Sequence, residues 1–196
     1  MSIAQISKTN NGVSSAHITG GNHRGDRQSD DFYPTTPECT LSFLSVELPY
    51  LHGKKVFEPC CGDGAISKLM EDAGLDVVSH DLVYRGYGTG DLDFLLTSET
   101  DCEAIVTNPP FNLSEKFIWH ALDVLKVPYL AMLLKSQYWH SKRRQKLFET
   151  HPPAVVYPMT WRPDFLKRGA PTMDFMWTVW RPHEGGTLYI PLNKIG

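Results

Sequence analysis

The segment Thr107-Asn108-Pro109-Pro110-Phe111 combines a side-chain amide, two successive prolines and an aromatic ring. Prolines fix the backbone and lack an amide hydrogen, so this loop would offer acceptors rather than donors. An amino group on a heteroaromatic ring is a poor nucleophile because its lone pair is delocalised into the ring. Oxygens of Asn108 and Pro109 that bind its hydrogens would free that lone pair, while Phe111 stacks on the ring. The motif predicts a catalytic loop formed by Asn108, Pro109, Pro110 and Phe111; a rigid turn is the alternative.

A second candidate site is the glycine-rich turn Glu58-Pro59-Cys60-Cys61-Gly62-Asp63-Gly64. Its glycines permit a tight turn and let a ligand approach the backbone closely. The turn has neither Gly-x-Gly-x-x-Gly nor Gly-Lys-Ser/Thr, and its two carboxylates would repel a pyrophosphate. It therefore predicts a cationic ligand, with contacts from Glu58, Pro59, Cys60, Gly62 and Gly64, although glycine could serve the turn geometry alone.

Two later acidic positions suit the rest of such a ligand. Asp81 follows Gly62 by nineteen residues, close to the spacing of about 20 at which an acidic side chain binds ribose hydroxyls. Asp93 could accept from an adenine amino group, and Phe94 could pack on the adenine face. S-adenosylmethionine fits this set, since its ammonium and sulfonium are positive and its carboxylate could meet a helix beginning at Pro37. Asp81 could instead be a turn residue, and Phe94 a core residue.

The elements that must position these residues alternate between strand and helix. Thr36 is a plausible N-cap with Pro37 at the first helical position, and Pro49 should stop that helix at about residue 48. Apolar, unalternating strands predict a Rossmann-like, doubly wound, mostly parallel α/β sheet with helices on both faces. Strands are expected at 55–58, 76–79, 104–107, 129–134, 154–157 and 173–180, and further helices at 64–73, 114–125 and 141–150.

The chain of 196 residues is expected to form one domain over 32–196, preceded by a flexible, polar tail over 1–31. Charge is segregated along it. Residues 51–129 contain six Lys/Arg against thirteen Asp/Glu, whereas residues 130–182 contain nine against three. An acidic half followed by a basic half fits a cationic cofactor and a polyanion, with two solvated faces as the alternative.

Other features exclude several classes of protein. The four cysteines, Cys39, Cys60, Cys61 and Cys102, have neither Cys-x-x-Cys spacing nor a His at finger-like distance, so we expect no metal site and no disulfide framework. The apolar run from Tyr129 to Leu134 is far too short to cross a bilayer. With no signal-like start, the protein is expected in the cytoplasm.

Taken together, these motifs make the chain resemble the class I S-adenosylmethionine-dependent methyltransferases, in particular the small DNA adenine N6-methyltransferases of phages and bacteria. The resemblance covers about residues 31–181. It implies that the segment from Phe32 to Pro37, with Tyr33, Thr35 and Thr36, helps to hold the methionine part of the cofactor. It further implies a cofactor loop at 58–64, a ribose acid at Asp81, an adenine pocket at Asp93 and Phe94, and a catalytic loop at 108–111.

Asn rather than Asp or Ser opens the catalytic motif, which mildly favours adenine over cytosine as the target. The sequence has no long insertion that could serve as a separate target-recognition domain, so selectivity must be short, weak or supplied by a partner. Alternatives are methylation of adenine in RNA or of a protein glutamine, and a non-catalytic nucleic-acid-binding protein that keeps the fold.

The basic second half is the expected nucleic-acid surface, because basic residues there are interleaved with aromatic ones. Phosphate contacts with DNA, or with RNA, are predicted for Lys135, Lys142, Arg143, Arg144, Arg162, Lys167 and Arg168. A solvated helix face and a loop anchored by its apolar residues are the alternatives.

Overall fold

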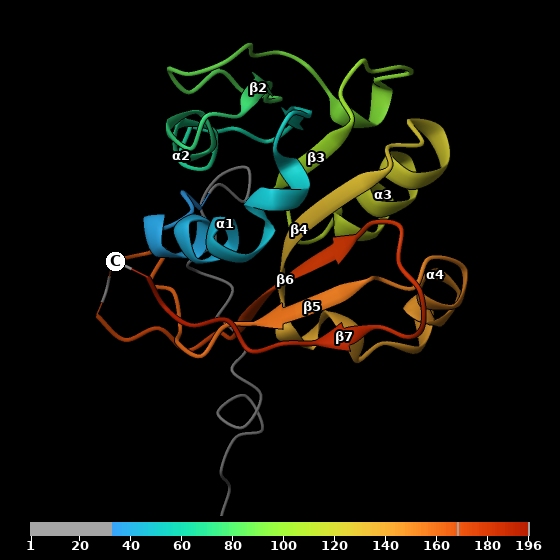
Figure 1. The fold of residues 1–196 in the computed structure, drawn as a ribbon. Helices are drawn as coiled ribbons and strands as arrows, with labels where there is room; N and C mark the ends of the chain where they lie inside the picture. Colours follow the sequence, from blue (N-terminus) through green and yellow to red (C-terminus); the bar gives the residue numbers. More distant parts are fainter. Residues whose placement is uncertain (1–32, 168, 196) are drawn as a thin grey trace, which may run out of the picture.

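A computed structural model describes residues 33–167 and 169–195; the predicted tail, Phe32 and Arg168 lie outside the described residues. The strands form one seven-stranded sheet in the order β2-β1-β3-β4-β6-β5-β7 (Figure 1). Strands β1, β2, β3 and β4 are parallel, and β6 lies antiparallel between β4 and β5. The strands span Lys55–Glu58 (β1), Asp76–Ser79 (β2), Ala104–Thr107 (β3), Tyr129–Lys135 (β4), Val155–Pro158 (β5), Phe175–Trp180 (β6) and Leu188–Tyr189 (β7).

Helices cover both faces of the sheet, as the unalternating apolar strands predict. In Figure 1, α1 and α2 lie on one side of the strands, and α3 and α4 on the other. The helices are α1 (Pro37–Leu51), α2 (Ser67–Asp72), α3 (Ser114–Trp119) and α4 (Gln145–Thr150); short 3-10 turns are η3 (Phe94–Leu96), η5 (Ser136–Trp139) and η6 (Lys142–Arg144), and η4 (His120–Val124) is a π-helical continuation of α3.

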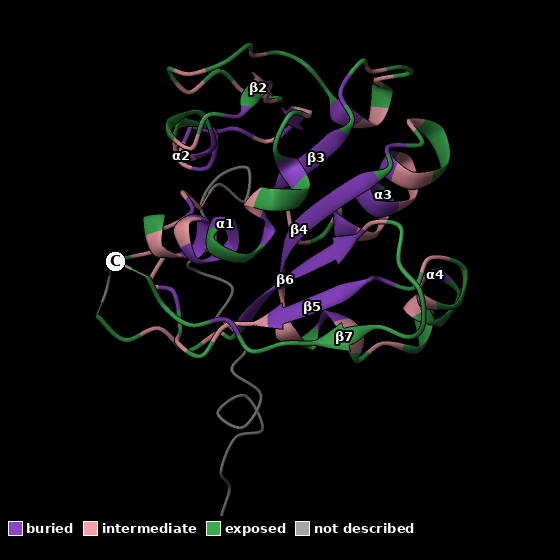
Figure 2. Ribbon diagram, viewed as in Figure 1, coloured by how far each residue is buried: buried purple, intermediate pink, exposed green. Residues whose placement is uncertain are grey.

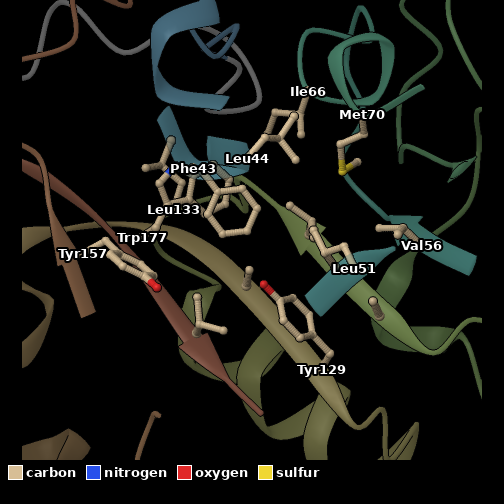
Figure 3. Close-up of a cluster of buried hydrophobic side chains, with 14 of the residues drawn as sticks. Phe43, Leu44, Leu51, Val56, Ile66, Met70, Tyr129, Leu133, Tyr157 and Trp177 are labelled. Atoms are coloured by element: carbon tan, nitrogen blue, oxygen red, sulfur yellow. The ribbon is translucent and has the colours of Figure 1, made fainter. Parts of the chain in front are cut away.

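Alternate residues of each central strand enter opposite layers of the core. From β4, Ala131 and Leu133 pack with Phe43 and Leu44 of α1, while Met132 lies in the layer that α3 and α4 cover. The central strands β1, β3, β4, β5 and β6 are accordingly coloured as buried along most of their length in Figure 2. The first layer is drawn in Figure 3, where side chains of α1 and α2 meet those of the sheet. Burial on both faces fixes the strand register.

Several predicted boundaries were wrong, each for a local reason. Helix α1 continues through Pro49 to Leu51, because Leu51 is fully buried and Pro49 deletes one helical hydrogen bond only at an exposed turn. Gly53, with φ of 77°, follows its end. Helix α2 begins at Ser67 rather than Gly64, since Gly64 has φ of 84° and no α-helix accepts that conformation.

Later in the chain, the helix expected over 114–125 changes to π-helical hydrogen bonding at His120. The helix expected over 141–150 opens with the 3-10 turn η6. Strand β6 begins at Phe175 rather than Met173, and β5 is shifted by one residue to end at Pro158. Strand β7 was not predicted, because its two exposed residues carry no strand pattern.

The chain order around β1 creates the binding edge. The chain passes from β1 to β2 on one side and then returns to β3 on the other side of β1. At such a switch point the loops leave in opposite directions, and a crevice opens beyond the carboxyl ends of the strands. The segments after β1, β2 and β3 are the ones that contain the predicted site residues.

Candidate active site

A hollow that is partly open to solvent lies at this switch point. Its walls come from the segment before α1, the turn after β1, the loop after β2, and the loop after β3. All four predicted catalytic residues line it, as do eight of the predicted cofactor-binding residues: Tyr33, Thr35, Glu58, Pro59, Cys60, Asp81, Asp93 and Phe94. The fold therefore brings together segments that are up to about 75 residues apart in the sequence, as the motif order requires.

The amide of Asn108 is the most informative group of the hollow. Its Nδ2 donates to Thr35 Oγ1 at 3.1 Å, whereas its Oδ1 is shielded from water and accepts no hydrogen bond. Among the described lining residues, this is the one buried side-chain acceptor that lacks a donor. A buried acceptor left unpaired costs about 1–3 kcal/mol, which a ligand N–H group would relieve.

The two prolines have different roles in the loop. The Pro110 carbonyl accepts from the Leu113 amide at 2.9 Å and so closes the turn into α3. Among the described residues, no donor binds the Pro109 carbonyl. The Phe111 ring lies 6.3 Å from the Tyr33 ring with an interplanar angle of 22°, and Lys135 Nζ stands 4.2 Å from the Phe111 centroid. An amide oxygen, a carbonyl oxygen and an aromatic face thus occupy neighbouring positions on one loop.

The turn after β1 is held to the end of β2 by Asp81. Its two carboxylate oxygens accept from the Gly62 amide at 2.8 Å and the Val83 amide at 2.9 Å. Each carboxylate oxygen has a second lone pair, so Asp81 can accept ligand hydroxyls while it fixes the turn. The predicted ribose acid is therefore also a structural link between two loops.

Glu58 is fully enclosed beneath the turn. It accepts a hydrogen bond from Ser67 Oγ, which in turn accepts from Ser79 Oγ at 2.7 Å. Burial raises the pKa of Glu58 to about 8, although the Ser67 hydrogen bond acts in the opposite direction. The raised pKa weakens the charge repulsion that the sequence analysis expects from Glu58 at neutral pH, unless a cationic ligand is bound nearby.

The two glycines of the turn are required by the backbone conformation and packing of the protein itself. Gly62 and Gly64, like Thr36, do not line the hollow. A Cβ at Gly64 would stand 2.7 Å from the Tyr87 ring, and Tyr87 Oη donates to Glu71 in α2 at 2.6 Å. Thr36 is the N-cap residue of α1 as predicted, but its hydroxyl contacts Cys39 Sγ at 3.2 Å instead of a backbone amide.

Asp93 and Phe94 form the far end of the hollow. Asp93 is an exposed residue whose Oδ1 accepts from the Leu95 amide at 2.9 Å. Phe94 is only 4% exposed and packs at 4.6 Å between centroids against Phe117 and at 6.0 Å against Phe57. Phe94 is therefore mainly a core residue, which also lines part of the hollow.

Eight lining residues lie outside the predicted segments: Ala65, Ile66, Leu82, Val83, Arg85, Leu92, Leu113 and Phe117. Pro34, Cys61 and Asp63 lie inside those segments but were not singled out as contacts. Leu82 and Val83 follow the predicted ribose acid Asp81 directly, a position that could have indicated them. Four carboxyl residues and one arginine line the hollow, and its apolar wall includes the exposed side chains of Leu82 and Leu92. This composition suits a ligand with positive charge and a flat apolar part.

Arg168 is not among the described residues; the other predicted nucleic-acid-binding residues lie outside the hollow and differ in their surroundings. Lys142 and Lys167 are exposed, and Arg143 is 72% exposed beside Glu115 at 3.1 Å. Arg162 pairs with Asp174 at 2.7 Å on the surface. Arg144, by contrast, donates to the Tyr138 carbonyl at 2.7 Å and lies over the Tyr138 ring, so its guanidinium stabilises the fold.

Residues 33–167 and 169–195 offer no thiolate nucleophile, no metal-binding cluster and no helix that could span a membrane. The cysteines are free, and burial raises the pKa of the Cys60 thiol and takes that of Cys61 to about 12, so the turn offers no thiolate nucleophile. This part of the chain has no group of three His, Cys, Asp or Glu side chains arranged to hold a metal ion. It also has no helix long and apolar enough to span a membrane.

Solved structures share this architecture at low sequence identity. A SAM-dependent methyltransferase from Archaeoglobus fulgidus aligns at a TM-score of 0.51 and 10% identity over 75% of this chain and 95% of its own. The 23S rRNA methyltransferase ErmE aligns at 0.54 and 14% identity over 76% and 70%. A Vibrio vulnificus protein, provisionally named the modification subunit of a type I restriction enzyme, aligns at 0.56 and 12% identity over 83% and 48%.

No family model and no curated protein matches the sequence. Proteins from Lactococcus lactis and Streptococcus thermophilus that are provisionally named hemolysins share the architecture as well, so the likeness concerns the fold alone. Strand order, the hollow at the switch point and these alignments agree. The chain has the Rossmann-like fold of the class I S-adenosylmethionine-dependent methyltransferases.

Proposed function

We propose that this protein transfers a methyl group from S-adenosylmethionine to the 6-amino group of adenine in DNA. The observation that carries the proposal is the Asn108 amide oxygen, a buried acceptor without a donor in the wall of the hollow. A planar amino group supplies the missing donor. Binding its hydrogens at Asn108 Oδ1 and the Pro109 carbonyl would localise the lone pair on nitrogen, which is the activation this reaction needs.

The hollow fits the cofactor on chemical grounds. S-adenosylmethionine supplies an activated methyl group when it is bound. Asp81 would hold the ribose hydroxyls, Asp93 the adenine amino group, and Glu58 would favour the positive amino-acid end from beneath the turn. Apolar residues that include Leu82 and Leu92 would cover the adenine faces.

The aromatic part of the site favours a nucleobase over a glutamine side chain. The nearly parallel rings of Phe111 and Tyr33 suit a flat, extended π-system. Lys135, beside Phe111, adds positive charge where the phosphates of a displaced nucleotide would pass. Exposed cations at Lys142, Arg143 and Lys167 would extend that charge over the neighbouring surface.

Adenine in RNA is the second candidate, supported by the shared fold of an rRNA methyltransferase. The fold of a protein named a restriction modification subunit supports DNA to the same limited degree. The test is to incubate purified protein and labelled cofactor with separate DNA, RNA and protein pools, and to identify the methylated residue by mass spectrometry. We expect N6-methyladenine in the DNA pool; label in RNA or glutamine alone would move the proposal to that substrate.

The role of Asn108 yields the first prediction. Asn108→Ala should retain cofactor binding by calorimetry and lose methyl transfer by roughly 100-fold or more, because the amino group loses its acceptor in the transition state. Asn112→Ala is the matched control, since Asn112 lies on the same loop but is exposed and outside the hollow wall. Equal rates for Asn108→Ala and wild type would contradict the assigned role.

A further inference from the structure

The segment before α1 contacts the catalytic loop from across the hollow. Thr35 Oγ1 accepts from Asn108 Nδ2 at 3.1 Å, and Thr35 is only 6% exposed. The Tyr33 ring stacks with the Phe111 ring at 6.3 Å. These side-chain contacts connect the segment to the loop after β3. Thr35 also lines the hollow, where the sequence resemblance implies a role in holding the cofactor.

The chemistry of an amide explains why this contact matters. The two ends of the Asn108 amide have nearly the same shape, but only the oxygen accepts a hydrogen bond. A rotation of 180° about the last side-chain bond would exchange them and place an N–H donor against the donor of the substrate. The hydrogen bond between Nδ2 and the Thr35 hydroxyl restrains this rotation, and in this arrangement Oδ1 is the end without a protein partner.

We propose that Thr35 is a positioning residue that holds the Asn108 amide with its oxygen available to the substrate amino group. The proposal rests on the proposed function for the identity of the reaction. It assigns Thr35 to the transfer step instead of cofactor affinity. Removing the hydroxyl should therefore lower kcat and leave the cofactor Kd unchanged.

The matching experiment uses the nearly isosteric change Thr35→Val. Single-turnover methyl transfer should fall roughly 10- to 100-fold, the loss expected when one orienting hydrogen bond is removed. Thr35→Ser, which keeps the hydroxyl, should recover most of that loss. Thr40→Val is the control: Thr40 is a buried threonine in α1 whose hydroxyl has no partner, so its removal should change nothing.

A second background separates the loss of the contact from a change in packing. In Asn108→Ala no side-chain amide is left for the Thr35 hydroxyl to hold. Thr35→Val should then cost at most about 3-fold when it is combined with Asn108→Ala, and a double-mutant cycle measures the difference. Equal losses in both backgrounds, or a weakened cofactor Kd in Thr35→Val, would overturn the positioning role.

A spectroscopic readout keeps this proposal separate from the choice of substrate. The side-chain amide signals of Asn108, assigned by their disappearance in Asn108→Asp, should shift and broaden in Thr35→Val as the amide begins to rotate. Unchanged signals would overturn the proposal even without any assay. If wild type methylates no nucleic acid while these signals respond as expected, the proposed function fails and the Thr35–Asn108 contact stands.

Discussion

At the scale of single residues, the site depends on polar groups whose state the fold sets. Asn108 is recognisable in the sequence from the prolines that follow it, but its unpaired oxygen is a product of tertiary packing. Glu58 is the sharper case. Its carboxyl group is present in the sequence, yet burial raises its pKa to about 8, so its charge at neutral pH depends on what binds above it.

This shift predicts how cofactor affinity depends on pH. A cationic ligand favours ionised Glu58, so affinity should rise with pH up to about 8 and then level off. Glu58→Gln should remove this part of the dependence while the titration of the cofactor itself remains. Calorimetric titrations from acid to alkaline pH measure the difference between the two proteins. Parallel curves for wild type and Glu58→Gln would show that Glu58 is not coupled to the cofactor.

The stability of the ligand-free protein provides an independent check. Glu58 would ionise near its ordinary value of 4.5 in the unfolded chain but near 8 in the folded chain. The unfolded state therefore releases this proton first, and the contribution of Glu58 to stability decreases as pH rises through that window. Thermal melts of Glu58→Gln should show a flatter pH profile than wild type between these values.

At the scale of elements, the sequence pattern indicates where a glycine-rich turn lies but does not show which residues pack against its glycines. Gly64 was predicted to approach a ligand, but the ring of Tyr87 occupies the space beside it. Tyr87 belongs to the loop after β2, and its carbonyl accepts from Cys61 Sγ of the turn after β1 at 3.7 Å. The two segments are thus in direct contact, and residues of both line the hollow.

The contact with Tyr87 predicts an unequal effect of two glycine substitutions. Gly64→Ala should destabilise the protein by about 2–4 kcal/mol, since it combines a left-handed backbone with overlap against the Tyr87 ring. Gly74→Ala, with almost the same φ of 85° but open space around the added Cβ, should cost only about 1 kcal/mol. Chemical denaturation measures both.

A variant of Tyr87 tests whether its ring causes the loss of stability in Gly64→Ala. Tyr87→Ala should recover part of the loss in Gly64→Ala, because it removes the ring that the new methyl group meets. Equal destabilisation by the two glycine variants would mean that only the backbone conformation matters.

At the scale of the whole molecule, folding brings the basic residues of the second half of the sequence to the edge of the sheet that holds the hollow. Strand β4 ends at Lys135, and η6 with Lys142 and Arg143 follows shortly after it. The segment with Arg162 and Lys167 connects the end of β5 to the start of β6. Since β6 is antiparallel, both connections lie at the edge that holds the hollow.

This arrangement predicts the salt dependence of nucleic-acid binding. Arg143→Glu should weaken binding and reduce the slope of log K against log salt by about one, as expected for the loss of one phosphate contact. Lys126→Glu is the control, because Lys126 is an exposed cation just before β4, at the opposite edge. Fluorescence anisotropy at several salt concentrations measures both, and identical slopes for the two variants would place the nucleic acid elsewhere. Arg144 is unsuitable for this test because its guanidinium holds Tyr138.

The sequence by itself determined the elements and the order of the motifs. Short apolar runs in the sequence specified β1, β2 and β3 to the residue, and the acidic and proline-rich segments after them indicated where a ligand would bind. These signals are local, so they survive without knowledge of the fold. The limits of α1 and α2 were missed because burial of Leu51 and the left-handed Gly64 override local propensity.

Only the tertiary structure decided which groups meet and in what state. The antiparallel insertion of β6, the contact of Thr35 with Asn108 and the buried Glu47 of α1, which accepts from Tyr129 at 2.9 Å and Tyr157 at 2.7 Å, all join residues far apart in the chain. No local pattern encodes such pairs. Their energies come from burial, which removes water as the competing partner and thereby makes each hydrogen bond and each pKa a property of the assembled fold.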